Sequence, residues 1–342
     1  MTAAAHERWF VSDQGLPTRW GDLLRPEGYV PVGIAVLCAA AVYVLWVRCG
    51  RRPLLPGPLA LGATPERLAV TMGWVPLLLA VHTAVPLLVS GVQGQLFAPN
   101  LEMLLPASAF VGLAEVAIAL LLFYGLFARY AALGLAGIWV IGAFLFGPSL
   151  LIEQVIFLGI AAFFWIVGRG PIAVDRLFGD WAGARVALLP YAVPALRVAT
   201  GLGIVWLAFT EKLLNLPLAL RFVEAYPFVN FAAGLGLPIT DVAFILAAGT
   251  VELLAGILLV SGAFPRIVIL LLWLPFNLTL TVFGWRELVG HLPIYATLAI
   301  VLFWGRGGEK DLESLRKGLI PLRPEGTPDP RRDSADREDG TA

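Results

Sequence analysis

Apolar stretches long enough to cross a lipid bilayer recur along most of this chain. A bilayer core of ~30 Å is spanned by a helix of about 20 apolar residues, and such stretches centre near residues 38, 80, 117, 139, 158, 204, 251, 275 and 297. Of the 342 residues 59% are apolar and 14% are charged, which is too much apolar surface for a water-soluble core. We therefore expect an all-α polytopic membrane protein with about nine transmembrane helices.

The distribution of lysine and arginine predicts the orientation of these helices. The first apolar stretch is followed, not preceded, by its arginines, which are Arg48, Arg51 and Arg52. A secretory signal peptide has the reverse arrangement, so we interpret this stretch as a retained helix. With the N-terminus outside, the cytoplasmic connections and the tail hold eighteen Lys and Arg, against six on the outer side. This asymmetry follows the positive-inside rule and predicts a cytoplasmic C-terminus.

The sequence also contains an internal repeat. Residues 112–170 align with 249–307 at an offset of 137 without a gap. Many of the matches are glycines and charged residues, including Glu115 with Glu252, Gly125 with Gly262, Arg129 with Arg266 and Gly147 with Gly284. An offset of 130 places Arg67 on Arg197 and His82 on Lys212. We expect two four-helix bundles of the same orientation, related by a pseudo-two-fold axis along the membrane normal.

This repeat divides the chain into five segments. We expect an extracytoplasmic N-terminal arm (1–29), a first transmembrane helix with a cytoplasmic linker (30–63), a first four-helix repeat (64–180), a second repeat (190–306) and a tail (307–342). The tail is charged, rich in proline and almost free of large apolar residues, so we expect it to be disordered.

The two repeats carry a family resemblance. A helix with a glutamate inside the membrane, then glycine and a basic residue at the turn, and a closing GRGP segment followed by Asp175, resembles the DoxX family of bacterial membrane proteins. The segments FTEKLLNLP, VELLAGILLVSGAFPR and ELVGHLPIYA also fit this pattern. The resemblance covers about two thirds of the chain. It implies four-helix units in the bacterial cytoplasmic (inner) membrane and, for some members, association with quinone-linked oxidoreductases such as thiosulfate:quinone oxidoreductase.

Ionisable residues in the second repeat coincide in height. Lys212, Glu252 and His291 each lie 14 or 15 residues from the arginine at the cytoplasmic end of their helix, which is ~21–22 Å at ~1.5 Å per residue. A charged group in the bilayer centre costs roughly 2.5–3.5 kcal/mol and almost always finds a partner. We therefore expect these three residues to form a ligand or proton-relay cluster. Their counterparts in the first repeat are His82, Glu115 and Gln154, of which only Gln154 is neutral.

Several other polar residues lie near this height. Glu211 and Asn215 flank Lys212, and either join the cluster or lie at the outer boundary of the membrane. Asn277, four residues below the layer, is expected to bond between helices. Glu153 and Glu287 are expected at loop ends near water.

The composition narrows the possible functions. Cys38 and Cys49 form no C-x-x-C motif, which disfavours thiol redox chemistry and iron–sulfur ligation, and there is no basic aromatic patch for nucleic acid. We expect no metal site, and His6 is only a weak metal candidate. The first hypothesis is a subunit or accessory protein of a quinone-linked oxidoreductase system, with an outward-opening polar pocket in the second repeat. A protein partner would then carry the electrons, because the sequence shows no redox centre.

Two alternatives remain open. The polar layer could lock the helices together in a non-redox scaffold, or in a protein that binds or transports a small anion or a lipid. A haem held by His82 and His291 is a weaker alternative.

Overall fold

The structure is a computed structural model that describes residues 7–178, 183–305 and 307–319. These residues form helices and no β-strand, apart from a single bridge between Gln95 and Glu102. The α-helices are α1 (Pro26–Arg48), α2 (Pro65–Gln93), α3 (Ala107–Tyr124), α4 (Ala128–Phe146), α5 (Pro148–Glu153), α6 (Ile156–Val167), α7 (Leu189–Leu207), α8 (Leu216–Ala225), α9 (Phe231–Gly234), α10 (Asp241–Ser261), α11 (Pro265–Trp304) and α12 (Glu309–Leu319). Shorter helical turns are η1 (Glu7–Trp9), η2 (Trp20–Leu24), η3 (Val174–Leu177), η5 (Val186–Leu188), η6 (Ala208–Leu213) and η7 (Pro227–Val229).

Among the described residues, seven helices are long and apolar enough to cross a membrane, so the prediction of an all-α, multi-pass membrane protein is confirmed. The expected number of nine stays a prediction. Two of the expected helices form the single 40-residue α11, which is interrupted by the non-helical backbone of Gly284. The stretch centred near residue 158 is divided into α5 and the 12-residue α6, and α6 is shorter than a full span.

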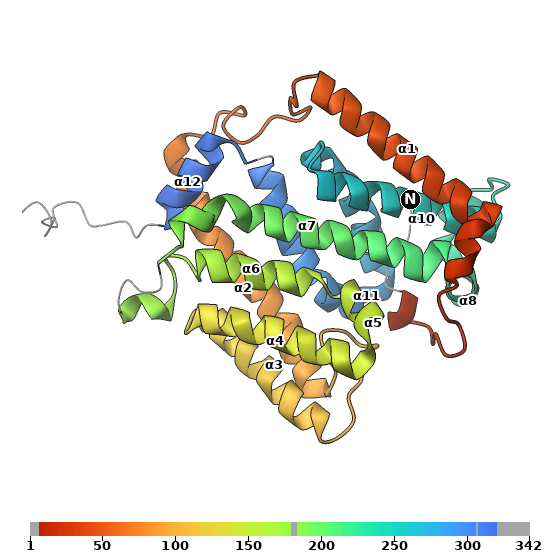
Figure 1. The fold of residues 1–342 in the computed structure, drawn as a ribbon, viewed down its shortest axis with the longest axis horizontal. Helices are drawn as coiled ribbons and strands as arrows, with labels where there is room; N and C mark the ends of the chain where they lie inside the picture. The colour runs from red at the N-terminus through yellow and green to blue at the C-terminus, as the bar shows by residue number, and fades with distance from the viewer. Residues whose placement is uncertain (1–6, 179–182, 306, 320–342) are drawn as a thin grey trace, which may run out of the picture.

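The long helices lie side by side in an order that differs from their order in the chain. Figure 1 shows α1, α10, α7, α6, α4 and α3 following one another across the molecule, and each neighbouring pair is in contact. Helices of the second repeat thus lie beside helices of the first. The two repeats meet twice, because the last helix of the first repeat, α6, packs on α7, and α11 of the second repeat packs on α2.

The turns of the two repeats have the same backbone signature. Left-handed φ angles recur 137 residues apart, at Gly125 and Gly262, Phe127 and Phe264, Gly147 and Gly284, Gly168 and Gly305, and Gly170 and Gly307. A positive φ is uncommon for phenylalanine, yet Phe127 (50°) and Phe264 (45°) both adopt one immediately before a helix. The aligned residues therefore end and begin helices at corresponding points of the chain.

The expectation of a disordered tail from residue 307 is wrong for its first part. Glu309–Leu319 forms α12, which packs on α2 and buries Leu315 and Leu319. Leucines spaced by three or four residues give this charged helix one apolar face. The helices approach closely, since a Cβ on Gly318 would lie 2.1 Å from the Ala69 carbonyl oxygen. Residues 320–342 and His6 lie outside the described residues.

Candidate functional site

Lys212 and Glu252 form a buried ion pair between two helices of the second repeat. Lys212 lies in η6, a turn of wider, π-helical geometry that continues α7, and such turns are frequent at functional sites. Its Nζ is 3.2 Å from Glu252 Oε2 in the middle of α10. Gly249, one turn before Glu252, makes room for this contact, because a Cβ there would lie 3.1 Å from the Lys212 Cβ. The predicted pairing of these two helices through their charged residues is therefore present.

An apolar cavity leads to this ion pair. It has a volume of about 280 Å³ and lies between α7, α10 and α11. Its lining is aliphatic and aromatic except for Lys212 and Glu252, and includes Ala255, Leu272 and Phe276. Val251, Leu271 and Leu274 also line it and are exposed on the outer surface of the helices. The cavity thus joins the apolar surface of the bundle to a buried lysine and a buried carboxyl group; we call it the α10 cavity.

The N-terminal arm, here residues 7–25, inserts between the helices next to this pair. The Glu7 Oε1 atom lies 3.5 Å from Lys212 Nζ, and the Glu7 backbone N–H donates to Glu211 Oε2 at 3.1 Å. Asn215 Nδ2 donates to the Leu16 carbonyl oxygen at 3.0 Å. The arm therefore makes the polar contacts on one side of the ion pair, and the apolar residues of the α10 cavity lie on the other side.

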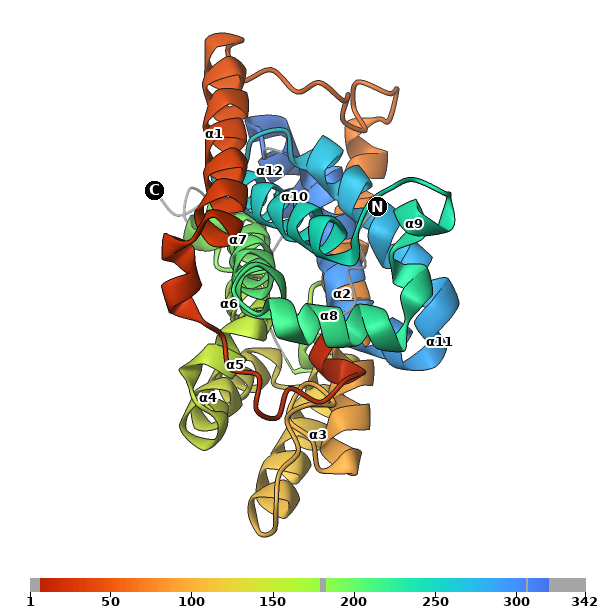
Figure 2. The same cartoon turned by 90° about the vertical axis from the view of Figure 1, so that its right-hand side faces the viewer.

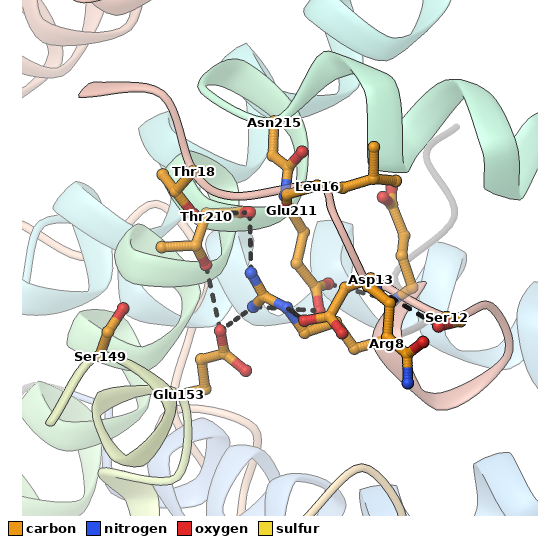
Figure 3. A network of polar contacts seen from close by, with 12 residues as sticks. Arg8, Ser12, Asp13, Leu16, Thr18, Ser149, Glu153, Thr210, Glu211 and Asn215 are labelled. Carbon is orange, nitrogen blue, oxygen red and sulfur yellow. Dashed lines mark hydrogen bonds and ion pairs between the residues drawn. The ribbon is translucent and has the colours of Figure 1, made fainter. Parts of the chain in front are cut away.

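Arg8 is the centre of the contacts shown in Figure 3. Its guanidinium forms an ion pair and donates a hydrogen bond to Glu153 at the end of α5, and lies 3.9 Å from Glu211 Oε1. It also donates to the Thr210 carbonyl oxygen at 3.2 Å and contacts the half-exposed Asp13 at 3.1 Å. Arg8 therefore joins the arm to both repeats.

His291 belongs to a neighbouring part of the site. Its ring lies 5.3 Å from Trp9 and 4.9 Å from Phe276 between centroids, and its Nδ1 is 3.3 Å from Glu287 Oε1 on the same helix. His291 thus reaches the Lys212–Glu252 pair through Phe276, which lines the α10 cavity, and through Trp9 of the arm.

The arm contacts corresponding positions of the two repeats. Glu153 and Gly290 are 137 residues apart; the first meets Arg8, and the second meets the following residue, Trp9. A Cβ on Gly290 would lie 2.2 Å from the Trp9 ring, so glycine leaves the space that the indole fills. Two consecutive residues of the arm therefore contact corresponding positions of the aligned repeats, Arg8 at Glu153 and Trp9 at Gly290.

The site contains more buried carboxyl groups than buried cations. Glu7, Glu153, Glu211 and Glu252, here called the carboxyl cluster, are all buried, with Arg8 and Lys212 among them. Burial raises the pKa of Glu7 to about 8, against the opposing charge of Lys212. Burial lowers the pKa of Arg8, but the carboxylates of Glu153 and Glu211 outweigh it and hold that pKa above its ordinary value. The environment of Glu7 thus favours its protonated form.

The corresponding residues of the first repeat are not gathered in this way. Glu115 accepts hydrogen bonds from the Ser90 hydroxyl at 2.7 Å and the Phe97 N–H at 3.0 Å. His82 contacts the Leu78 carbonyl oxygen of its own helix at 2.8 Å and lines a separate groove between α2 and α11. Gln154 is buried at the end of α5. The first repeat therefore has a buried glutamate held by neutral donors, without an ion pair.

Three of the sequence-based expectations need correction. Asn277 is exposed and donates to the Trp273 carbonyl oxygen of its own helix at 2.7 Å, so its hydrogen bond is not between helices. Glu153 and Glu287 are buried and do not lie near water. Both follow glycines that interrupt a helix, Gly147 and Gly284, and both lie in the helical segment that resumes after the glycine, where they are buried.

Sequence reasoning missed Glu7 and Arg8, which the arm brings into the site. The residue types of Glu7 and Arg8 gave no indication that they are buried, because a segment of mixed charge before a first helix is ordinarily solvated. The adjacent Trp9 and Phe10 were the available sign, since two large aromatic residues beside the charges favour burial of the segment.

Comparisons of the chain with family models, with curated proteins and with solved structures find no match.

Proposed function

We propose that this chain is a DoxX-like integral membrane subunit, or accessory protein, of a quinone-linked oxidoreductase system, and that the α10 cavity binds the quinone. The observation that carries the proposal is the combination of an apolar cavity reaching the lipid-facing surface with a lysine and a glutamate at its inner part. A quinone has the same division, because its tail is apolar and its ring carries two carbonyl acceptors.

The cavity fits one ring of this kind. Its volume of about 280 Å³ is near the lower end of the ~300–1,000 Å³ range of small-molecule sites. The exposed Val251, Leu271 and Leu274 at its edge would contact the tail where it leaves for the lipid. Glu252 Oε1 is buried and has no hydrogen-bond partner, so an acceptor inside the site is left for a ligand hydroxyl.

Each polar residue would have a distinct role. Lys212 has donors for a ring carbonyl oxygen, and Glu252 can give a proton to that oxygen or accept a hydrogen bond from the hydroxyl group of the reduced ring. Phe276 would pack on the ring and hold its edge away from water. A quinone supplies a carrier for two electrons and two protons, and the polar residues of this chain hold the protons.

The electrons would come from a protein partner, because the sequence offers no C-x-x-C motif or cofactor loop for a redox centre. The chain is then a subunit or accessory protein, without catalytic residues that act alone. The pseudo-two-fold relation of the two repeats belongs to the same proposal, supported by the recurring backbone turns and by the two reciprocal contacts, α6 with α7 and α2 with α11.

A second candidate is a non-redox lipid-binding protein whose polar residues lock the helices. The contacts of Arg8 with both the arm and α5 favour it, since they join parts far apart in the sequence. A small anion is disfavoured as the ligand, because the carboxyl cluster outnumbers its cations.

The test is purification of the protein in native-lipid particles without detergent, followed by extraction and mass spectrometry of bound quinone. Glu252→Gln and the matched surface variant Glu224→Gln are purified in parallel; Glu224 is exposed on α8. We expect about one quinone per chain in the wild type and in Glu224→Gln, and at least a tenfold lower content in Glu252→Gln. Equal lipid but no quinone in all three would favour the lipid-binding candidate instead.

A further inference from the structure

The carboxyl cluster carries an excess of negative charge that the described residues do not balance. Four buried carboxyl groups (Glu7, Glu153, Glu211 and Glu252) surround two buried cations, Arg8 and Lys212. If all were ionised, two negative charges would remain in a site closed to water. An unpaired buried charge is so unfavourable that the group takes up a proton instead.

Three carboxyl oxygen atoms of the cluster also indicate an excess of negative charge. Glu7 Oε2, Glu211 Oε1 and Glu252 Oε1 are buried and accept no hydrogen bond. Each belongs to a glutamate whose other oxygen is already engaged, with Lys212 or with the Glu7 backbone. A proton on such an oxygen turns an unsatisfied acceptor into a donor. The cluster therefore has places for protons as well as a charge that favours them.

A metal ion is a poorer occupant than protons. Among the described residues, no three His, Cys, Asp or Glu side chains are grouped so that they could hold a metal. The carboxyl groups are instead separated by Arg8 and Lys212, and a cation between them would meet two positive charges.

The neighbouring charges do not cancel the excess. The cluster itself consists of Glu7 and Arg8 from η1, Glu153 from α5, Glu211 and Lys212 from η6, and Glu252 from α10. The charged groups next to it are the partly exposed Asp13 of the arm, which contacts Arg8, and, beyond Trp9, Glu287 and His291 from α11. Arg286 is exposed and donates to the Trp9 carbonyl oxygen at 3.1 Å. Glu287 adds a further carboxyl group, paired with His291.

We propose that the carboxyl cluster is a proton-binding site that holds two protons at neutral pH and that the N-terminal arm completes it by supplying Glu7 and Arg8. The arm side of the site reaches water at Asp13, which is 45% exposed and contacts Arg8. The other side reaches the α10 cavity at Glu252.

Lys212 joins the two sides of this site. Its Nζ lies between Glu7 Oε1 at 3.5 Å and Glu252 Oε2 at 3.2 Å. A proton can pass from the Glu7 carboxyl group to Lys212 as Lys212 passes another of its three protons to Glu252. The number of protons and the total charge are unchanged by this step, and Lys212 is an ammonium group before and after it.

The proposal is tested on the full-length protein in quinone-free lipid particles, so that its result does not depend on the quinone assignment. Infrared spectra in H₂O and D₂O measure protonated carboxyl groups, whose C=O band shifts on isotope exchange. The variants are Glu7→Gln, Lys212→Met and the exposed control Glu224→Gln.

All proteins measured carry Glu115→Gln, because the buried Glu115 of the first repeat would add a carboxyl band of its own. In this otherwise wild-type background we expect two exchangeable protonated carboxyl groups at pH 7, and the same number when Glu224→Gln is added. Glu7→Gln should leave one, because it removes one negative charge and leaves both cations. Lys212→Met should raise the number to three, because it removes a positive charge. If Lys212→Met fails to fold, Glu7→Gln decides the question alone.

The proposal is overturned if the wild type shows no protonated carboxyl group at pH 7, or if Glu7→Gln shows the same number as the wild type. It is also overturned if sodium or potassium binding, measured as a salt-specific gain in thermal stability lost in Glu7→Gln, replaces the protonated carboxyl band.

Discussion

Lys212 Nζ lies 3.2 Å from Glu252 Oε2, which connects the end of α7 with the middle of α10 inside the second repeat. The first repeat has a glutamate at the position corresponding to Glu252, but Glu115 is held by the Ser90 hydroxyl and the Phe97 N–H. The same helix pair is therefore joined by neutral hydrogen bonds in one repeat and by an ion pair beside a cavity in the other. This difference locates the candidate site in the second repeat.

Removal of the lysine should destabilise the protein strongly. Lys212→Met leaves Glu7 and Glu252 without their shared cation, and breaking a buried pair typically costs about 3–5 kcal/mol. The loss should be partly recovered in Lys212→Met/Glu252→Gln, which removes both charges, with a coupling of about 0.5–3 kcal/mol. Reversible unfolding in detergent measures the free energy of unfolding of Lys212→Met, of Glu252→Gln and of the double variant. Strictly additive effects of the two substitutions would show that the pair contributes no coupling energy.

Removal of the arginine should detach the arm. Arg8→Gln leaves Glu153 and Glu211 without their cation, and we expect a loss of about 3 kcal/mol together with faster proteolysis of the arm. Arg25→Gln is the matched control, since Arg25 is 69% exposed and pairs with Asp22 in the same arm; exposed pairs contribute about 0–1 kcal/mol. Similar proteolysis rates for the two variants would contradict the anchoring role of Arg8.

The stability of the protein should depend on pH through Glu7. Burial raises the pKa of Glu7 from 4.5 to about 8, so between these values the folded state holds a proton that the unfolded state has lost. The stability contribution is therefore fully present below pH 4.5 and falls as the pH rises to about 8. Unfolding measured from pH 5 to pH 8 should show a shallower loss of stability in Glu7→Gln than in the wild type. An identical slope would mean that Glu7 titrates normally.

The absence of a side chain at Gly290 should be required for Trp9 of the arm to pack against α11. A Cβ there would lie 2.2 Å from the Trp9 ring, so Gly290→Ala must displace the indole, at about 1–3 kcal/mol. Gly137→Ala is the control, because its new Cβ would meet no atom within 4 Å. Tryptophan fluorescence should show a more solvated indole in Gly290→Ala and no change in Gly137→Ala. A stable Gly290→Ala protein with unchanged fluorescence would contradict the position of Trp9.

The membrane-spanning character and the repeat were readable from the sequence, because hydropathy and aligned glycines report local properties. The 137-residue offset aligned Gly147 with Gly284, and the structure shows that these glycines interrupt helices at corresponding points. The common height of Lys212 and Glu252 predicted that these two residues meet.

The remaining parts of the site depend on long-range contacts that no local pattern encodes. Glu7 and Arg8 lie in the segment that precedes α1, and this segment inserts between the two repeats. Figure 2 shows this first segment beside α8 at one end of the bundle. His291 shared the predicted height, but height along the membrane normal does not fix which face of α11 carries a residue, so it contacts Trp9 and Phe276.

The location of a bound quinone tests the central claim most directly. A photoreactive quinone analogue is added to the protein in lipid particles, and the cross-linked peptides are identified by mass spectrometry in the wild type, in Ala255→Phe, which fills the α10 cavity, and in the exposed control Ala40→Phe. We predict cross-links within Val251–Leu258 and Val268–Phe276 that disappear in Ala255→Phe and persist in Ala40→Phe. Cross-links confined to other segments, such as the groove around His82 and Phe303, or unchanged by Ala255→Phe, would contradict quinone binding in the α10 cavity.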